Sequence, residues 1–123
     1  MLFPDYRPRR MRQSSAFRRM IRETRLSVDD LILPIFAIGG KNQKIPIPSM
    51  PGQFQLSIDN VVKLAKSVHE LNIPGIILFG LPDKKDPLGT GAYAKNGIVQ
   101  QAVKAVKDRH PDLAVITDVC LCQ

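Results

Sequence analysis

An acid and two thiols stand at alternate positions near the end of the chain, in the segment ITDVCLCQ at residues 116–123. Asp118, Cys120 and Cys122 follow a run of strand-like residues, and successive side chains of a strand point to opposite faces. The three side chains therefore share one side for as far as extended geometry continues. Two thiolates on one side suit Zn²⁺, which prefers sulfur and takes four ligands, or three and a water molecule in a catalytic site. The segment offers half of such a site.

A disulfide between the two cysteines is the first alternative. Residues two apart in an extended strand have Cα atoms about 6.6 Å apart with parallel Cβ vectors, which is a poor geometry for a bridge. We therefore expect both thiols to remain available. A C-x-C pair on its own is a weak signal, because reduced cysteines in a strand also serve as ordinary packing residues. Asp118 has a similar alternative, as a carboxylate that accepts hydrogen bonds from loop amides.

The other polar groups give weaker signals. His69 follows Val68 on a predicted helix and His110 precedes Pro111 in a turn. Neither has a partner at metal-ligand spacing in the sequence, so we interpret both as surface histidines. The GTG stretch at 89–91 matches no phosphate-binding loop and indicates a flexible one. The residues alone leave the function open.

Strand-like and helix-like periods alternate along the chain after residue 30. The segments LILPIFAI at 31–38, GIILFG at 75–80 and LAVITDVC at 113–120 predict strands. Pro34 lacks a backbone donor, so the first strand must be bulged or lack a partner there.

Two helices and two loops connect these strands. The segments 45–52 and 81–97 are rich in proline, glycine and polar residues and predict loops. Apolar residues at helical spacing predict one helix capped by Ser57 and another from Asn96 onward. Their expected buried stripes are Ile58, Val61, Val62, Ala65, Val68 and Leu71, and Ile98, Val99, Ala102, Val103 and Val106.

The order strand, helix, strand, helix, strand predicts a parallel sheet with right-handed crossovers, either doubly wound or part of a barrel. In both architectures ligands gather at the carboxyl ends of the strands. Asp118 and the two cysteines fall at that end of the third strand.

The composition is that of a globular protein with a basic arm. Hydrophobic residues make up 44% and charged residues 24% of the 123 residues, which argues against wholesale disorder. There is no apolar run of membrane-spanning length and no secretory signal, so we expect a cytoplasmic protein. Residues 1–25 hold eight arginines against two acids and so carry +6 of the net charge of +7. Such an arm is more typical of a contact with an acidic surface on another subunit than of nucleic-acid binding.

Several segments together resemble the delta-aminolevulinic acid dehydratase (porphobilinogen synthase) family. They are RPRRMR, LILPIF, IPIPSMPG, IPGIILFG and above all ITDVCLC, in collinear order over nearly the whole chain. The resemblance implies an α/β fold, the N-terminal portion of a TIM (β/α)8 barrel with about three parallel strands and two helices. Residues 1–30 would be an arm that contacts a neighbouring subunit of a homo-oligomer, typically an octamer, and residues 31–123 the first βαβαβ part of the barrel.

The resemblance also implies a reaction and a metal. The family condenses two molecules of 5-aminolevulinate to porphobilinogen, with loss of water, in tetrapyrrole and heme biosynthesis. Asp118 matches an active-site acid, and Cys120 and Cys122 match the first two of three cysteine ligands to a catalytic Zn²⁺. An allosteric Mg²⁺ is a further expectation from the family. No nucleic-acid or membrane partner is expected.

The family pattern continues beyond Gln123. Its third cysteine and its Schiff-base lysines have no counterpart here, and the lysines of this chain fall in loops or on solvent sides of helices. We therefore expect a truncated chain that is unstable or oligomeric alone and turns over no 5-aminolevulinate. Two alternatives stay open, which are a non-catalytic interaction module that docks through its arm and a basic-arm binder of anions or nucleic acid.

Overall fold

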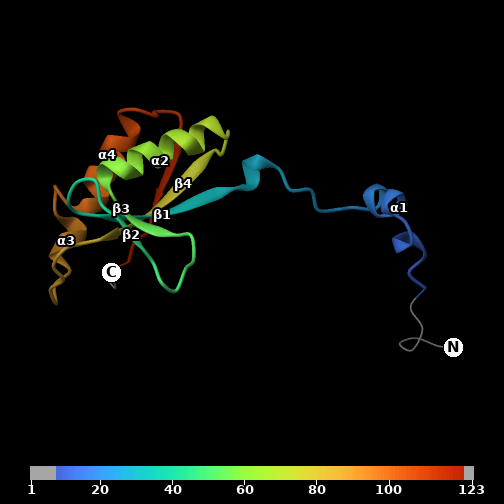
Figure 1. Cartoon of the computed structure of the whole chain (residues 1–123), viewed down its shortest axis with the longest axis horizontal. Helices are drawn as coiled ribbons and strands as arrows, with labels where there is room; N and C mark the ends of the chain where they lie inside the picture. The colour runs from blue at the N-terminus through green and yellow to red at the C-terminus, as the bar shows by residue number, and fades with distance from the viewer. Residues whose placement is uncertain (1–7, 121–123) are drawn as a thin grey trace.

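The computed structural model describes residues 8–120, and its body is a five-stranded sheet with two long helices packed against it (Figure 1). The strands stand in the order β2-β3-β1-β4-β5, and all neighbours are parallel except the β2–β3 pair. The elements of the body are β1 (Ile32–Ile38), β2 (Lys44–Pro46), β3 (Phe54–Ser57), α2 (Ile58–Glu70), β4 (Gly75–Leu81), α3 (Thr90–Tyr93), α4 (Ile98–Lys107) and β5 (Ala114–Thr117).

The three strands and two helices expected from periodicity are confirmed as β1, β4, β5, α2 and α4. Three short elements were not expected. The segment 45–52 was predicted as loop, yet its first residues belong to β2, and β3 follows before α2. The segment 81–97 contains the one-turn helix α3. Elements of three or four residues are too short to show a period.

Pro34 lies in a continuous strand. β1 pairs with β4 along its whole length, with Pro34 opposite Ile77, so the bulge that was one alternative is wrong. On the other side β3 pairs with β1 only from Phe36 to Ile38. Pro34 therefore has no partner on that side, which was the other alternative and is how a sheet tolerates a missing donor.

Helices α2 and α4 cover one face of the sheet and form the core with it. Ile35, Ala37, Ile76 and Leu78 of the strands are buried against the helices. The buried helix residues are Val61, Val62, Ala65, Val68, Ala102 and Val106, while Ile58, Ile98 and Val103 are partly buried beside them. Leu71 was expected in this stripe but is 65% exposed, because α2 ends at Glu70 and Leu71 is its C-cap.

Gly80 of β4 lies beneath the first turn of α4. A Cβ at Gly80 would lie 2.4 Å from Val99 Cγ2 and 2.8 Å from Ile98 Cγ2. A side chain at this position would require the Val99 and Ile98 side chains, or the helix itself, to shift, so the packing of the first turn of α4 on β4 is suited to glycine.

The second face of the sheet is apolar but less buried. Phe36 of β1 stacks on Phe79 of β4, with ring centroids 5.3 Å apart and 23° between the ring planes. Ile116 of β5 stands opposite Ile77 and is 40% exposed. A barrel turns this face inward, and the described strands form a part of such a barrel.

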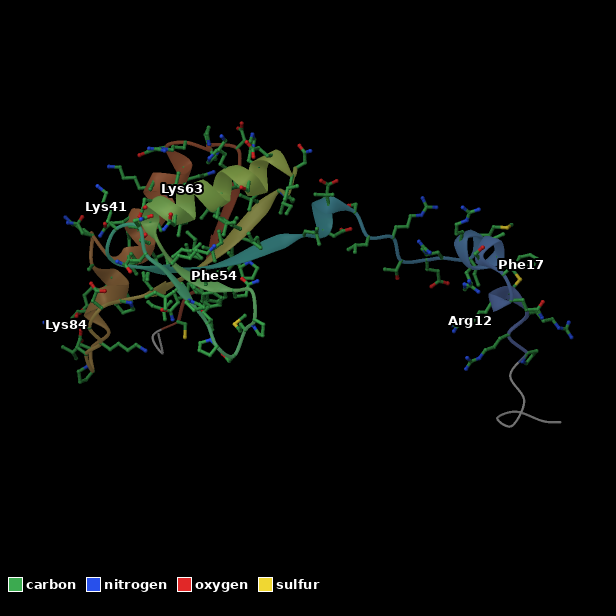
Figure 2. The ribbon with its side chains drawn as sticks, viewed as in Figure 1. Arg12, Phe17, Lys41, Phe54, Lys63 and Lys84 are labelled. Atoms are coloured by element: carbon green, nitrogen blue, oxygen red, sulfur yellow. The ribbon has the colours of Figure 1, made fainter. Side chains whose placement is uncertain are left out.

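An arm extends away from the body. It holds the 3-10 turns η1 (Arg10–Arg12) and η2 (Val28–Asp30) and the short helix α1 (Ser15–Met20), none of which buries a residue. Figure 2 shows Arg12 and Phe17 at the far end of this arm, remote from Phe54 and Lys63 on the body. Within residues 8–120 no helix has the length and apolarity of a membrane span.

Candidate functional site

Asp118 stands where two parallel strands end side by side. β4 ends at Leu81 and β5 at Thr117, and the strands are in register up to the pair Leu78 and Thr117. The Asp118 N–H donates to the Leu78 carbonyl oxygen at 3.4 Å. The acid is therefore placed at the carboxyl edge of the sheet, as the sequence predicted.

A pocket of about 240 Å³ opens at this edge. Asp118 and Cys120 both line it, together with Gly80 at the end of β4 and Lys84 in the loop that follows. The first turn of α4 closes one side through Ile98. The structure thus brings Asp118 and Cys120 to one pocket, whose lining also includes Lys84, Lys85 and Asp86.

The cysteine expectations are partly wrong. The strand was predicted over 113–120, but β5 ends at Thr117 and the next three residues are not part of the sheet. The argument against a disulfide assumed that the strand continues through Cys120, whereas β5 ends at Thr117. The structure records Cys120 as disulfide-bonded, so the expectation that the thiols remain available does not hold for it. Cys122 lies outside the described residues.

The described residues do not complete a metal site. Among residues 8–120 no group of three or more His, Cys, Asp or Glu side chains could hold a metal ion. A zinc site that includes Cys120 would therefore need ligands from outside this range, and the assignment of Asp118, Cys120 and Cys122 stays a prediction.

The loop beside the pocket is ordered by Asp86, which the sequence analysis did not single out. Its carboxylate accepts hydrogen bonds from the N–H groups of Leu88 at 2.9 Å and Thr90 at 3.3 Å, and from the Thr90 hydroxyl. The Thr90 hydroxyl bond and then the Thr90 N–H hold the pKa of Asp86 below its usual range. The GTG stretch was interpreted as flexible, but Gly89 takes a left-handed φ of 62° and precedes α3. The four-residue helix is fixed against the pocket rim by this carboxylate.

A second polar cluster joins the start of α2 to the loop after β1. Ser57 is the N-cap residue of α2, as expected, but its side chain makes no cap hydrogen bond. Its hydroxyl donates to Asp59 Oδ1 at 2.6 Å and accepts from the Gln43 N–H at 2.9 Å. The Asn42 N–H donates to Asp59 Oδ1 at 3.1 Å. The Ser57 bond, followed by the Asn42 N–H, lowers the pKa of Asp59. The sequence could not reveal this cluster because its two halves lie in separate segments.

Replacing Asp59 with asparagine is expected to destabilise the chain at neutral pH. The pKa of Asp59 is lowered in the folded state, so ionised Asp59 stabilises the fold above the usual aspartate range, and the stabilisation is lost as pH falls through the folded-state pKa. The difference in Tm between the parent and D59N should therefore shrink with acid, measured by thermal unfolding from pH 7 to pH 3. Asp112 is exposed and lies outside the cluster, so D112N is the matched control. A pH-independent difference between the parent and D59N would contradict the role of the charge.

Comparison with known proteins places these features in a family. The family model for delta-aminolevulinic acid dehydratase matches residues 5–123. A delta-aminolevulinic acid dehydratase of Synechocystis sp. is 53% identical over 122 residues, covering 99% of this chain and 37% of that protein. One from Methanothermus sociabilis is 50% identical over 123 residues, covering all of this chain and 38% of that protein. The chain thus spans little more than a third of the length of these relatives.

A solved structure agrees with the fold. The crystal structure of delta-aminolevulinic acid dehydratase (porphobilinogen synthase) from Toxoplasma gondii ME49, in complex with the reaction product porphobilinogen, superimposes with a TM-score of 0.85 at 32% identity. The match covers 94% of this chain and 33% of that chain. The fold of this chain is therefore that of about a third of a larger protein.

Proposed function

Because the chain belongs to the delta-aminolevulinic acid dehydratase family, we propose that it supplies the first part of an enzyme that condenses two molecules of 5-aminolevulinate to porphobilinogen with loss of water. The observation that carries this proposal is the match of residues 5–123 to the family, together with 53% identity to the Synechocystis relative. The Toxoplasma protein was crystallised with porphobilinogen as its reaction product, which supports the same reaction. The boundary between an arm of residues 1–30 and a barrel part of residues 31–123 belongs to the proposal, and it falls between η2 and β1.

Asp118 is the residue of this chain that we assign to proton transfer. It lies at the carboxyl edge of β5 and lines the pocket, where a bound substrate would meet it. The condensation removes protons from carbon and nitrogen and delivers them to leaving water, so a positioned carboxylate has a direct task. Lys84 lines the same pocket, and its ammonium group is suited to a substrate carboxylate.

Cys120 and Cys122 are proposed as two ligands of a catalytic Zn²⁺ in the reduced protein. Sulfur donors fit zinc, and Cys120 shares a pocket with Asp118. The disulfide at Cys120 must be reduced first, since the thiolate is the ligand. When bound, zinc would supply Lewis-acid polarisation of a substrate carbonyl. An allosteric Mg²⁺ stays a prediction.

The arm is proposed to contact a second subunit of a homo-oligomer, with an octamer as the family's typical state. Its side chains are exposed throughout residues 8–30, and they include Phe17, Met20 at 77% and Leu26 at 81% exposure. A basic and partly apolar arm whose residues 8–30 are all exposed is suited to a partner. A cytoplasmic location suits the proposal because zinc binding needs reduced cysteines.

The test joins residues 1–123 to the remaining two thirds of the Synechocystis relative. Pyrrole formation from 5-aminolevulinate is measured with Ehrlich reagent for the fusion and for the 123-residue chain alone. The fusion is expected to form product and the chain alone is not, because Schiff-base lysines are supplied only by the added part. Zinc content is measured after reduction, and a fusion with both cysteines changed to serine is expected to lose it.

Two results would contradict the proposal. One is product formation by the 123-residue chain, and the other is a fusion with the circular dichroism and oligomeric state of the relative but no activity. An inactive chain that co-purifies with the intact Synechocystis relative would instead support the interaction module. Retention of zinc without the two cysteines would contradict the metal assignment while leaving the reaction intact.

A further inference from the structure

Two imidazole rings meet at the end of the sheet opposite to Asp118. The ring centroids of His69 and His110 lie 5.5 Å apart, with 37° between the ring planes. His69 lies in the last turn of α2, and His110 lies in the turn between α4 and β5. Both turns lead into the amino ends of parallel strands, whereas Asp118 follows a carboxyl end. The sequence analysis interpreted the two histidines separately, and the fold brings them together.

The backbone fixes both positions. The Asn72 N–H donates to the His69 carbonyl oxygen at 3.0 Å. The His110 N–H donates to the Val106 carbonyl oxygen at 2.8 Å, and its own carbonyl accepts from the Leu113 N–H at 3.2 Å. Val106 and Leu113 are buried in the core between the helices and the sheet. The rings therefore project from one packed unit, and little backbone entropy has to be lost for both to bind one ligand.

The spacing fits a shared metal ion. An imidazole nitrogen binds a divalent transition metal at about 2.0–2.1 Å, which puts each ring centroid about 3.2 Å from the ion. Two rings at a tetrahedral angle are then about 5.2 Å apart. The observed 5.5 Å is close to this value, and since His69 is exposed and His110 only half-buried, small side-chain rotations can close the difference.

The charges around the pair do not oppose a cation. Residues 66–70 at the end of α2 and residues 107–112 from the end of α4 onward together carry three basic and three acidic side chains, so their formal charges cancel. Lys107 directs its ammonium to the carbonyl oxygens of Pro111 at 2.6 Å and Leu113 at 2.9 Å. Lys66 lies 3.6 Å from the Glu70 carboxylate. The charged residues of the two segments are Lys66, Glu70, Lys107, Asp108, Arg109 and Asp112.

We propose that His69 and His110 form a two-histidine site for a borderline divalent transition-metal ion, the class that includes Ni²⁺, Cu²⁺ and Zn²⁺. Imidazole favours these ions over Mg²⁺ and Ca²⁺, which prefer oxygen. Among the residues 8–120 no third His, Cys, Asp or Glu joins the pair, so water completes the coordination. Bound metal links the end of α2 to the turn before β5 and stabilises the folded chain. The site is separate from the proposed active site.

The test uses the chain with Cys120 and Cys122 both changed to serine, so that the cysteines cannot bind the probe. Nickel chloride is titrated by calorimetry, and Tm is measured with and without nickel. This doubly substituted chain is the parent of the test, and it is expected to bind one nickel ion per chain and to have a higher Tm with nickel than without it. His69→Gln and His110→Gln are each expected to lose the binding and the gain, while keeping the Tm of the nickel-free parent. Lys66→Gln, one turn before His69 on α2, is the matched control and should behave as the parent.

Circular dichroism of each variant without nickel confirms the fold before titration. Absence of nickel binding by the folded parent overturns the proposal. Retention of binding in either histidine variant also overturns it, because the ion would then sit on a single histidine. Neither result bears on pyrrole formation by the fusion, which depends on the opposite end of the strands.

Discussion

Replacing Asp118 with asparagine in the fused protein is expected to lower the rate of pyrrole formation by about 10²-fold to 10⁴-fold, the range for loss of a positioned acid or base. Asparagine keeps the size and the backbone hydrogen bond from residue 118 to the Leu78 carbonyl, but it cannot take up and return a proton. The effect should appear in kcat more than in KM, because the proton moves in the transition state. The measurement is initial rate against 5-aminolevulinate concentration.

The matched control for Asp118 is Asp112→Asn. Asp112 is exposed and stands six positions earlier, before β5 begins, so its substitution should leave the rate within about twofold. If D118N keeps the parent rate while its zinc content is also unchanged, Asp118 has no part in the chemistry. If D118N loses zinc together with activity, Asp118 acts through the metal and not through proton transfer.

Replacing Gly80 with alanine is expected to destabilise the chain by about 3 kcal/mol, at the upper end of the cost of overpacking. The new methyl carbon would lie 2.4 Å from Val99 Cγ2, so the Val99 and Ile98 side chains must leave their rotamers or α4 must move away from β4. The free energy of unfolding of a domain is usually about 5–15 kcal/mol. We expect a lower value for a chain whose sheet is incompletely covered, so a loss of this size is a large fraction of it. Chemical denaturation with urea, followed by circular dichroism, measures the change.

Gly91→Ala separates this packing effect from the general effect of removing a glycine. A Cβ at Gly91 would lie 3.5 Å from Pro82 Cβ, an ordinary contact, and Gly91 stands in a helix, where alanine is favoured. We expect G91A to be neutral or slightly stabilising. A G80A variant as stable as G91A would show that α4 does not pack as closely on β4 as the structure has it.

The sequence predicted the long elements because burial imposes a period on them. β1 and β4 are continuous apolar runs, and α2 buries Val61, Ala65 and Val68 at helical spacing. β2 and β3 have three and four residues, so they show no period. β3 depends on pairing with β1, and β2 on pairing with β3. Short elements of this kind depend on tertiary contacts that a single sequence does not display.

The candidate site was predictable where it depends on strand order and not where it depends on local geometry. Asp118 and Cys120 follow β5 directly, so their placement at the carboxyl edge follows from the alternation of strands and helices. The end of β5 at Thr117 was not predictable, since ITDVC continues the strand-like composition. The Asp59 cluster depends on Asn42, which lies 17 residues away and meets it only after the chain folds back.

The two edge strands of the sheet, β2 and β5, differ in how readily they can pair with a further strand. β2 is a three-residue strand that ends at Pro46, and Pro48 follows it closely. Short, proline-bearing edge strands discourage the addition of another strand. β5 at the opposite edge, with the sequence AVIT, has neither proline nor charge. A further strand therefore joins most readily beside β5, whereas closure of a barrel at the other edge must use the first residues of β1, which β3 leaves unpaired.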